Sequence, residues 1–308
     1  MKLSIVSTMY QSSAYVAEFC ERIGDAARRL VGEDFEIVLV NDGSPDNSCD
    51  VAVALTRDNP HLVVVDLSRN FGHHKAMMTG LQQARGDRVF LIDIDLEEEP
   101  EDLARFWEAM ASQPCDVVYG VQAQRKGGRF ERWSGRLFYR LFKMLTRMAL
   151  PEDVLTARLM TRRYVDALVL HDEREVFIAG LWHITGFVQH PLMLRKHSTS
   201  ETTYTLRRKL ALLVNSVTSF SNVPLVAIFY CGLAISCLAT IYIIVLLVQW
   251  SMLSRPLSGW TSVMASIWLL GGMIISFIGV VGIYLSKIFS ETKRRPYTII
   301  REIHGAKH

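Results

Sequence analysis

Residues 88–95, Arg88-Val89-Phe90-Leu91-Ile92-Asp93-Ile94-Asp95, form a short apolar run that ends in two aspartates. A run of this length and composition predicts a buried strand. Similar runs recur along the first part of the chain, separated by segments with helical spacing of apolar residues. The expected strands are Leu3–Ser7, Phe35–Val40, Leu62–Leu67, Arg88–Ile94 and Asp116–Val121, and the expected helices are Tyr15–Leu30, Cys49–Arg57, Lys75–Ala84 and Pro100–Met110. This alternation predicts right-handed βαβ units and a mostly parallel sheet, the α/β class.

The residues that carry chemistry should follow these strands, because ligands of such sheets bind beyond the carboxyl ends of the strands. Asp93 and Asp95 lie two residues apart on an extended segment, so their carboxylates point the same way. Together they can bind one divalent ion, for which hard oxygen ligands favour Mg²⁺ or Mn²⁺, and which would stabilise a departing diphosphate. An isolated Asp-x-Asp is common, so the pair alone leaves other roles open. The following Glu97-Glu98-Glu99 is typical of the charge favoured at a helix N-terminus.

Two further strand ends carry polar residues that suit a nucleotide. Asp42, in Val40-Asn41-Asp42-Gly43-Ser44, follows the second expected strand. Its carboxylate can accept a hydrogen bond from a nucleobase N–H or a ribose hydroxyl, although the motif is equally typical of a turn or a helix cap. Thr8 and Tyr10, just beyond the first strand, can contact a base, and a packing role fits them as well.

Two segments can bind anionic phosphate groups. Asn70-Phe71-Gly72-His73-His74-Lys75 leads into a helix, so the backbone N–H groups around Gly72 and the Lys75 side chain can bind a diphosphate. Adjacent histidines rarely point to one ion, so His73-His74 is not expected to bind a metal. The second segment is a basic loop after the fifth strand, with Arg125, Arg129 and Arg132. It is either a solvated loop or a site for a lipid phosphate, which the planar guanidinium group suits.

The last third of the chain is apolar. No charged residue lies between Lys209 and Arg255, and none lies from Pro256 to Ser286. Because a membrane-spanning helix needs roughly 20 apolar residues, two spans are expected, Leu225–Val248 and Val263–Leu285. Lysines and arginines precede the first span and follow the second, which places both termini in the cytoplasm by the positive-inside rule. The first residues do not have the pattern of a signal peptide, which agrees with this orientation.

These features define four expected regions. They are an α/β domain in residues 1–203, an amphipathic helix in 204–222, the two spans in 223–286 and a basic cytoplasmic tail in 287–308. The amphipathic helix suits a membrane surface, and packing on the soluble domain is the alternative. The net charge is only +3, too small to indicate a nucleic-acid partner. The basic residues cluster beside the spans, where anionic lipid or a lipid phosphate is the expected partner.

Several of these motifs occur in a fixed order. In the first part of the chain the order is Asn41-Asp42-Gly43-Ser44, Arg69-Asn70-Phe71-Gly72, Asp93-Ile94-Asp95-Leu96 with Pro100-Glu101, and Asp116-Val117-Val118-Tyr119-Gly120. Two further motifs flank the expected spans: Ser219–Leu225 leads into the first, and Arg294-Arg295-Pro296-Tyr297 follows the second. In this combination the chain closely resembles family 2 glycosyltransferases of GT-A fold, a Rossmann-like architecture. The specific likeness is to bacterial polyprenyl-phosphate glycosyltransferases related to dolichyl-phosphate mannose synthase, and it covers essentially the whole chain.

The resemblance implies a function and a set of roles. The chain would transfer a sugar, with inversion, from a nucleotide sugar to polyprenyl phosphate at the inner membrane, with its catalytic domain in the cytoplasm, for cell-surface glycan synthesis or modification. The expected donor is a UDP-sugar, with a guanosine donor left open. Asp42 would hold the nucleotide, Asp93 and Asp95 the donor and the metal, and Arg125, Arg132 and Arg195 phosphate groups. The expected assembly is a homo-oligomer, often a tetramer.

The chain also departs from the family pattern. Thr156 stands where an aspartate proposed as a catalytic base is usual, and His73-His74 replaces a more usual Lys-Glu. A phosphate acceptor is mostly dianionic at neutral pH, so it can attack without a strong base. Two alternatives remain. One is an enzyme with another acceptor, such as a diacylglycerol or a polysaccharide, and the other is a non-catalytic membrane scaffold that binds nucleotide sugar.

Overall fold

The structure is a computed structural model of the chain and describes residues 1–122, 144–146, 154–194, 214, 217–218, 221–253 and 259–305. The chain divides into two compact units. The first contains Met1–Tyr139, Ala149–Thr205 and Arg295–His308, and the second contains Arg140–Met148 and Leu206–Arg294.

The first unit is built on one eight-stranded sheet with the order β7-β5-β6-β4-β1-β2-β3-β8. The strands are β1 (Leu3–Met9), β2 (Phe35–Asn41), β3 (Leu62–Leu67), β4 (Arg88–Leu91), β5 (Val117–Gln122), β6 (Val154–Thr161), β7 (Gln189–Leu194) and β8 (Ile300–Gly305). The central strands β4, β1, β2 and β3 are parallel, as expected from the sequence. Strand β6 runs antiparallel to both β4 and β5, and β8 runs antiparallel to β3. The α/β class is therefore confirmed, with a mixed sheet.

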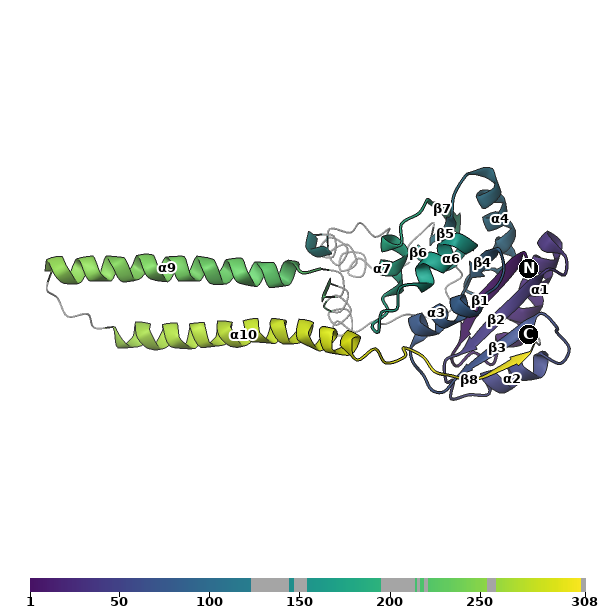
Figure 1. Ribbon diagram of the computed structural model, residues 1–308, viewed down its shortest axis with the longest axis horizontal. Coiled ribbons are helices and arrows are strands. Elements are labelled where there is room, and N and C mark those ends of the chain that lie inside the picture. The colour runs from purple at the N-terminus through teal and green to yellow at the C-terminus, as the bar shows by residue number, and fades with distance from the viewer. Residues whose placement is uncertain are drawn as a thin grey trace. The chain divides into compact units, whose positions relative to one another are not determined.

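Helices cover both faces of this sheet (Figure 1). They are α1 (Val16–Val31), α2 (Ser48–Leu55), α3 (His73–Gln83), the 3₁₀ helix η1 (Pro100–Asp102), α4 (Leu103–Ser112), α6 (Arg162–Val169) and α7 (Ile178–Ile184). On one face α1 contacts both α2 and α4, and on the other α3 packs with α6. Gly80 brings α3 close to the sheet, since a Cβ atom there would lie 2.5 Å from Val6 Cγ1. This contact fixes the helix whose first turn borders the site described below.

Strand β4 is shorter than the sequence predicts. Its pairing with β1 ends at Leu91, and the last backbone bond runs from Ile92 N–H to the Val6 carbonyl at 3.1 Å. The chain then turns, and Leu96 has a positive φ of 58°. Asp93 and Asp95 therefore lie on a turn beyond the strand, where the alternation of side chains along a strand no longer governs their directions.

Part of the expected C-terminal tail forms a strand. Residues 300–305 form β8, which pairs with β3 from Val63↔Gly305 to Leu67↔Ile300. Without β8, the outer N–H and C=O groups of β3 would form an open sheet edge. At Gly305, with φ of +100°, a Cβ atom would lie 2.1 Å from the Leu62 carbonyl oxygen, so only glycine fits there. The segment after the last long helix is thus part of the sheet.

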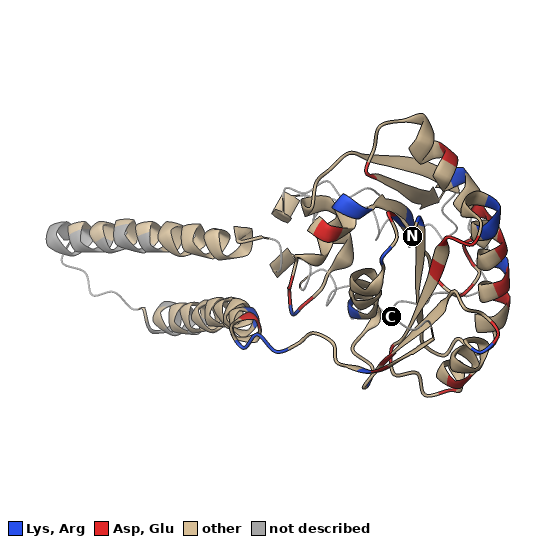
Figure 2. Cartoon of the chain, turned by 45° about the vertical axis from the view of Figure 1, so that its right-hand side comes forward, with Lys and Arg blue, Asp and Glu red and all other residues tan. Residues whose placement is uncertain are grey.

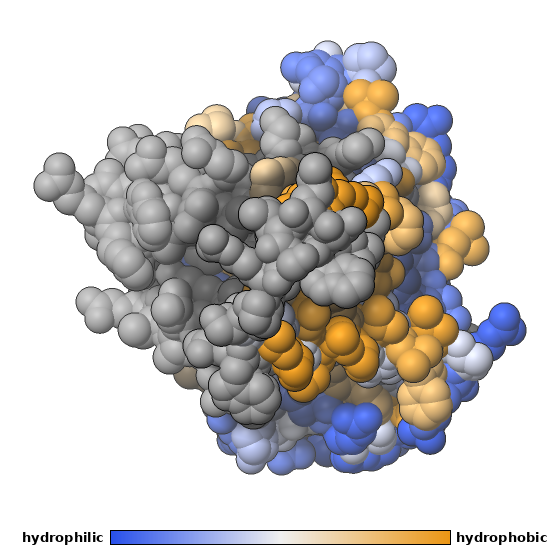
Figure 3. Space-filling view, turned by 90° about the vertical axis from the view of Figure 1, so that its left-hand side faces the viewer, coloured by the Kyte–Doolittle hydropathy of each residue, from blue (hydrophilic) through white to orange (hydrophobic). Residues whose placement is uncertain are grey.

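The second unit contains the long helices α9 (Val223–Leu253) and α10 (Trp260–Thr292). The Tyr284 hydroxyl of α10 donates to the carbonyl of Ser221, just before α9, at 2.6 Å. Among the described residues of α9 and α10, the charged ones lie at the C-terminal end of α10 (Figure 2). Exposed apolar side chains along this helix include Ile275, Ile278 and Leu285, and Figure 3 shows the apolar surface in orange.

One helix of the described residues is long and apolar enough to cross a membrane, the part of α10 from Leu269 to Thr292. The expectation of two spans is therefore met only in part. In α9 the apolar segment found among the described residues is Val223–Ile235. At 1.5 Å per residue this segment is shorter than the roughly 30 Å hydrocarbon core of a bilayer.

Candidate functional site

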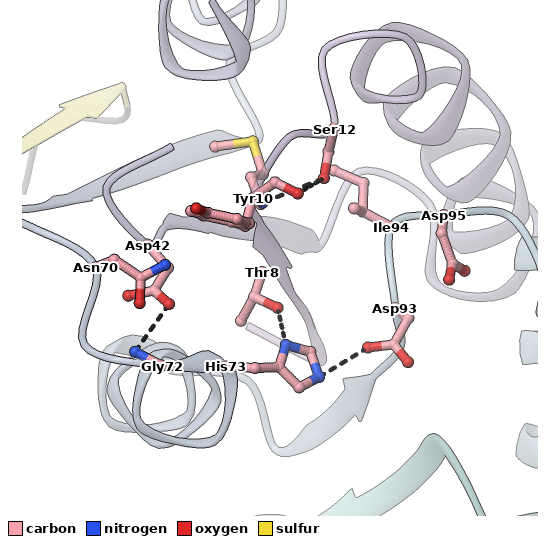
Figure 4. A pocket seen from close by; sticks show the side chains of 11 residues that line it. Thr8, Tyr10, Ser12, Asp42, Asn70, Gly72, His73, Asp93, Ile94 and Asp95 are labelled. Atoms are coloured by element: carbon pink, nitrogen blue, oxygen red, sulfur yellow. Dashed lines mark hydrogen bonds and ion pairs between the residues drawn. The ribbon is translucent and has the colours of Figure 1, made fainter. Parts of the chain in front are cut away.

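A pocket of about 420 Å³ opens beyond the carboxyl ends of β1, β2 and β4 (Figure 4). Its lining comes from the segments that follow these strands and from the start of α3. The lining residues are Thr8, Met9, Tyr10, Ser12, Asp42, Asn70, Gly72, His73, Asp93, Ile94 and Asp95. Six residues proposed from the sequence are thus brought together: Thr8, Tyr10, Asp42, Gly72, Asp93 and Asp95.

Asp42 organises one wall of the pocket. Its buried carboxylate accepts the backbone N–H groups of Phe71 at 2.7 Å and Gly72 at 3.0 Å. Burial raises the pKa of Asp42, and these two hydrogen bonds oppose the rise. The sequence interpretation directed the same N–H groups to a diphosphate, but the structure directs these two to Asp42.

Gly43 allows this wall to form. It has a φ of +59°, and a Cβ atom there would lie 2.4 Å from the backbone carbon of Arg69 and the backbone nitrogen of Asn70. Glycine therefore serves both the left-handed conformation and the close approach of two backbones. Gly43 thus lets the turn after β2 pack directly against the loop after β3.

Asp46 joins the loops that follow β1 and β2. Its Oδ1 accepts the hydroxyls of Ser44 and Ser48, each at 2.5 Å, and its Oδ2 accepts the Ser13 N–H at 3.3 Å. Burial acts against its charge, but the hydrogen bonds from the two serines hold the pKa of Asp46 below its usual range. Ser44 Oγ in turn accepts the N–H of Gln11 at 2.7 Å.

His73 lies inside the pocket and was not proposed as a site residue from the sequence. Its Nδ1 lies 2.9 Å from the Thr8 hydroxyl, and its Nε2 lies 3.4 Å from Asp93 Oδ1. Burial opposes protonation, but the hydrogen bond and negative charge of Asp93, with Asp42 and Asp95 nearby, raise the pKa of His73. Its place at the start of a helix after a strand was the available sequence signal, whereas its proximity to Asp93 is a property of the fold.

Asp93 and Asp95 both line the pocket, and their side chains diverge. Figure 4 shows the Asp93 carboxylate turned toward His73, while Asp95 lies beyond Ile94 on the same turn. Asp95 Oδ1 accepts the N–H of Glu97 at 3.0 Å. Among the described residues, no group of three or more His, Cys, Asp or Glu side chains is arranged to hold a metal. Two carboxylates still fit Mg²⁺, which commonly binds one or two carboxylates together with substrate phosphates and water.

Glu98 has a structural role that the sequence did not indicate. Its buried carboxylate accepts the N–H groups of Thr156 and Ala157 of β6, both at 3.1 Å. The turn that carries Asp95 is thereby tied to the strand that carries Thr156. The guanidinium group of Arg158, also buried, donates to the Thr156 and Leu155 carbonyls.

The remaining proposed residues are placed differently. Lys75 lies in the first turn of α3 and is not among the residues that line the pocket. The proposed phosphate-binding residues Arg125, Arg129, Arg132 and Arg195 lie outside the described residues, as does most of the proposed amphipathic helix.

The sheet and its pocket define an α/β protein with an acidic pocket at the carboxyl edge of the parallel strands. Residues 4–168 match the family described as Glycosyl transferase family 2, and the chain belongs to this family. It is therefore a glycosyltransferase.

Its relatives include a protein named "Putative glycosyltransferases" from Mycobacterium tuberculosis (strain CDC 1551 / Oshkosh), 52% identical over 99% of this chain and 89% of that protein. The SfII prophage-derived bactoprenol glucosyl transferase of Shigella flexneri is 31% identical over 99% of both chains. Among solved structures, S. aureus TarS 1-349 in complex with UDP-GlcNAc matches with a TM-score of 0.47 and 17% identity, covering 71% of this chain and 66% of that chain.

Proposed function

We propose that this glycosyltransferase moves a sugar from a UDP-sugar to polyprenyl phosphate, with inversion and with Mg²⁺ or Mn²⁺ as cofactor. The observation that carries the proposal is the pocket that brings Asp42 together with Asp93 and Asp95 from separate strand ends. Support for the acceptor comes from relatives that align along the whole chain and are named for bactoprenol, a polyprenyl lipid.

The pocket suggests a division of roles for the donor. Tyr10, with 48% of its surface exposed, and Thr8 lie where a base or ribose can bind, near Asp42. Asp93 and Asp95 would hold the divalent ion, which supplies positive charge to the leaving diphosphate. His73 would hold Asp93 in place from the other side of the pocket.

The reaction needs little acid–base chemistry. A lipid phosphate oxygen forms the new bond to the anomeric carbon, the bond from that carbon to the diphosphate oxygen breaks, and the electron pair leaves with the nucleotide. The acceptor phosphate is mostly dianionic at neutral pH, so positioning and charge stabilisation can provide most of the acceleration. Thr156 in place of an aspartate is compatible with this mechanism. Arg125, Arg129, Arg132 and Arg195 remain the proposed ligands of the phosphate groups.

The proposed location is the cytoplasmic face of the inner membrane. The candidate span in α10 supports membrane attachment, and α9 is proposed as the second span of a helical hairpin. Lys293, Arg294 and Arg295 follow α10, as expected on the cytoplasmic side. The catalytic unit would then face the cytoplasm as part of a homo-oligomer, with a tetramer as the expected state.

Incubation of the purified full-length protein with undecaprenyl phosphate, Mn²⁺ and labelled donors tests the proposal. The donors are UDP-glucose, UDP-N-acetylglucosamine and GDP-mannose, each assayed separately. We expect label in the lipid phase with one UDP-sugar. Transfer only to diacylglycerol or polysaccharide would replace the acceptor, and binding of a donor with no transfer to any acceptor would favour the scaffold.

A further inference from the structure

Strand β8 brings the charged side chain of Arg301 to the end of β3, at the start of the loop that carries the pocket residues Asn70 and Gly72. Arg301 Nη1 lies 3.2 Å from Asp66 Oδ2, and Arg301 Nη2 donates to the Ser68 carbonyl at 2.8 Å. Only 8% of the Asp66 side chain is exposed, whereas 60% of the Arg301 side chain is exposed. The guanidinium group therefore connects a buried carboxylate near the end of β3 to the first residue after that strand.

The same carboxylate connects β3 to β2. Asp66 Oδ1 accepts the side-chain amide of Asn41 at 2.7 Å, and Asn41 Oδ1 accepts the N–H of Ser44 at 3.2 Å. Asn41 directly precedes Asp42, the residue that holds the N–H groups of Phe71 and Gly72. A continuous set of polar contacts therefore runs from Arg301 to the ends of both strands that border this part of the pocket.

Neighbouring residues of the C-terminal segment reinforce these contacts. The Ser68 N–H donates to the Ile299 carbonyl at 2.9 Å. The Thr298 hydroxyl lies 2.8 Å from the Thr79 hydroxyl on α3, the helix that begins with His73. The loop from Ser68 to Gly72 is thus held by Asp42 on one side and by the C-terminal segment at its start.

We propose that Arg301 is a positioning residue of the pocket. By pairing with Asp66 and Ser68, it keeps the ends of β2 and β3 in the arrangement in which Asp42 receives the Phe71 and Gly72 N–H groups. Without the guanidinium group, the buried Asp66 carboxylate loses its cation and must rearrange to reach water, which moves Asn41 with it. The assignment of a nucleotide as the ligand of this pocket rests on the proposed function.

Hydrogen–deuterium exchange of the full-length protein tests the positioning itself. Arg301→Ala should increase exchange in peptides covering residues 38–46 and 68–76, with little change in peptides from β5 and β6. Arg57→Ala, which removes an exposed arginine from the turn after α2, is the matched control and should change neither. Arg301→Lys keeps the charge but not the paired geometry, and its exchange should fall between wild type and Arg301→Ala. Unchanged exchange in both pocket segments, or a uniform increase across all strands, would overturn the proposal.

A titration with UDP and Mn²⁺ in the absence of lipid then measures the consequence for binding. Arg301→Ala should raise the Kd by roughly two- to thirtyfold, the range typical of residues that act through a contact network. Asp66→Asn should raise it similarly, and the double variant should add little, because both changes break the same contact. If the wild-type protein binds no UDP, the proposed donor is wrong. The exchange experiment then decides alone whether Arg301 positions the pocket. A wild type that binds UDP with a Kd equal to that of Arg301→Ala would overturn the role of Arg301.

Discussion

The imidazole of His73 lies between the Thr8 hydroxyl, 2.9 Å from Nδ1, and Asp93 Oδ1, 3.4 Å from Nε2. It connects the end of β1 to the turn after β4 across the pocket. Half of the His73 side-chain surface is exposed, at a site where a donor would bind. The histidine therefore contacts the Asp93 carboxylate and also lines the pocket.

Replacing His73 should weaken donor binding. We expect His73→Ala to raise the donor KM about tenfold, the loss of one charge-assisted contact of roughly 1.5 kcal/mol. His183→Ala, which removes an exposed histidine from α7, is the control and should behave as wild type. Steady-state kinetics at varied donor concentration provide the measurement, and an unchanged KM would remove His73 from the site.

The tight contact at Gly43 predicts a difference between two glycines. Gly43 and Gly32 have similar positive φ values, +59° and +66°, but only Gly43 has backbone atoms where a Cβ atom would lie. Gly43→Ala should therefore cost about 2 kcal/mol more than Gly32→Ala, or roughly 4–8 °C in the thermal midpoint. Equal thermal midpoints for the two variants would show that the turn at Gly43 and the loop at Arg69 can move apart without loss of stability.

Asp46 should make stability depend on pH in the acidic range. In the folded state the pKa of Asp46 lies below its usual value. The ionised carboxylate therefore stabilises the fold at pH values above its pKa in the unfolded chain, about 3.9, and this stabilisation is lost as the pH falls through its pKa in the folded protein. Asp46→Asn should lower the thermal midpoint at pH 7, and the gap to wild type should shrink below about pH 4. A gap of constant size between pH 7 and pH 3 would contradict this role.

Thr156 allows a test of whether the reaction lacks a base. A missing general base would cost about a hundredfold in rate, so restoring one should increase turnover by that amount. We expect no gain from Thr156→Asp, since the acceptor phosphate needs no base and the buried Glu98 carboxylate already binds the Thr156 N–H. Thr156→Ser is the control, and the measurement is turnover at saturating donor. A gain approaching a hundredfold would show that a base is required.

The sequence predicted the first part of the fold well because its signals are local. The expected strands of this part match β1 to β5 within a few residues, since apolar runs followed by turn residues mark each of them. Asp42, Asp93 and Asp95 were placed near one another for the same reason, because parallel strands bring their carboxyl ends to one edge. Of the Asp-Gly-Ser motif after β2, Asp42 lines the pocket, and its role toward a ligand stays a prediction.

Other features depend on contacts between distant residues. Strand β6 contains the buried Arg158, and β8 has the sequence Ile300-Arg301-Glu302-Ile303-His304-Gly305, so neither has the composition of a buried strand. Strand β8 finds its partner β3 far back in the chain, which no local pattern indicates. The approach of His73 to Asp93 is likewise set by how α3 packs on the sheet.

The most direct test of the account is the transfer rate of Asp95→Asn. Asp95 follows β4 and lines the pocket, whereas Asp87 is exposed before the same strand, so Asp87→Asn is the matched control. Both purified full-length variants are assayed with labelled UDP-sugar, Mn²⁺ and undecaprenyl phosphate. We predict that Asp95→Asn retains less than about a tenth of wild-type turnover, a barrier increase above 1.36 kcal/mol, while Asp87→Asn retains all of it. Turnover of Asp95→Asn above that tenth, with its thermal midpoint unchanged, would contradict the metal-assisted transfer proposed for this pocket.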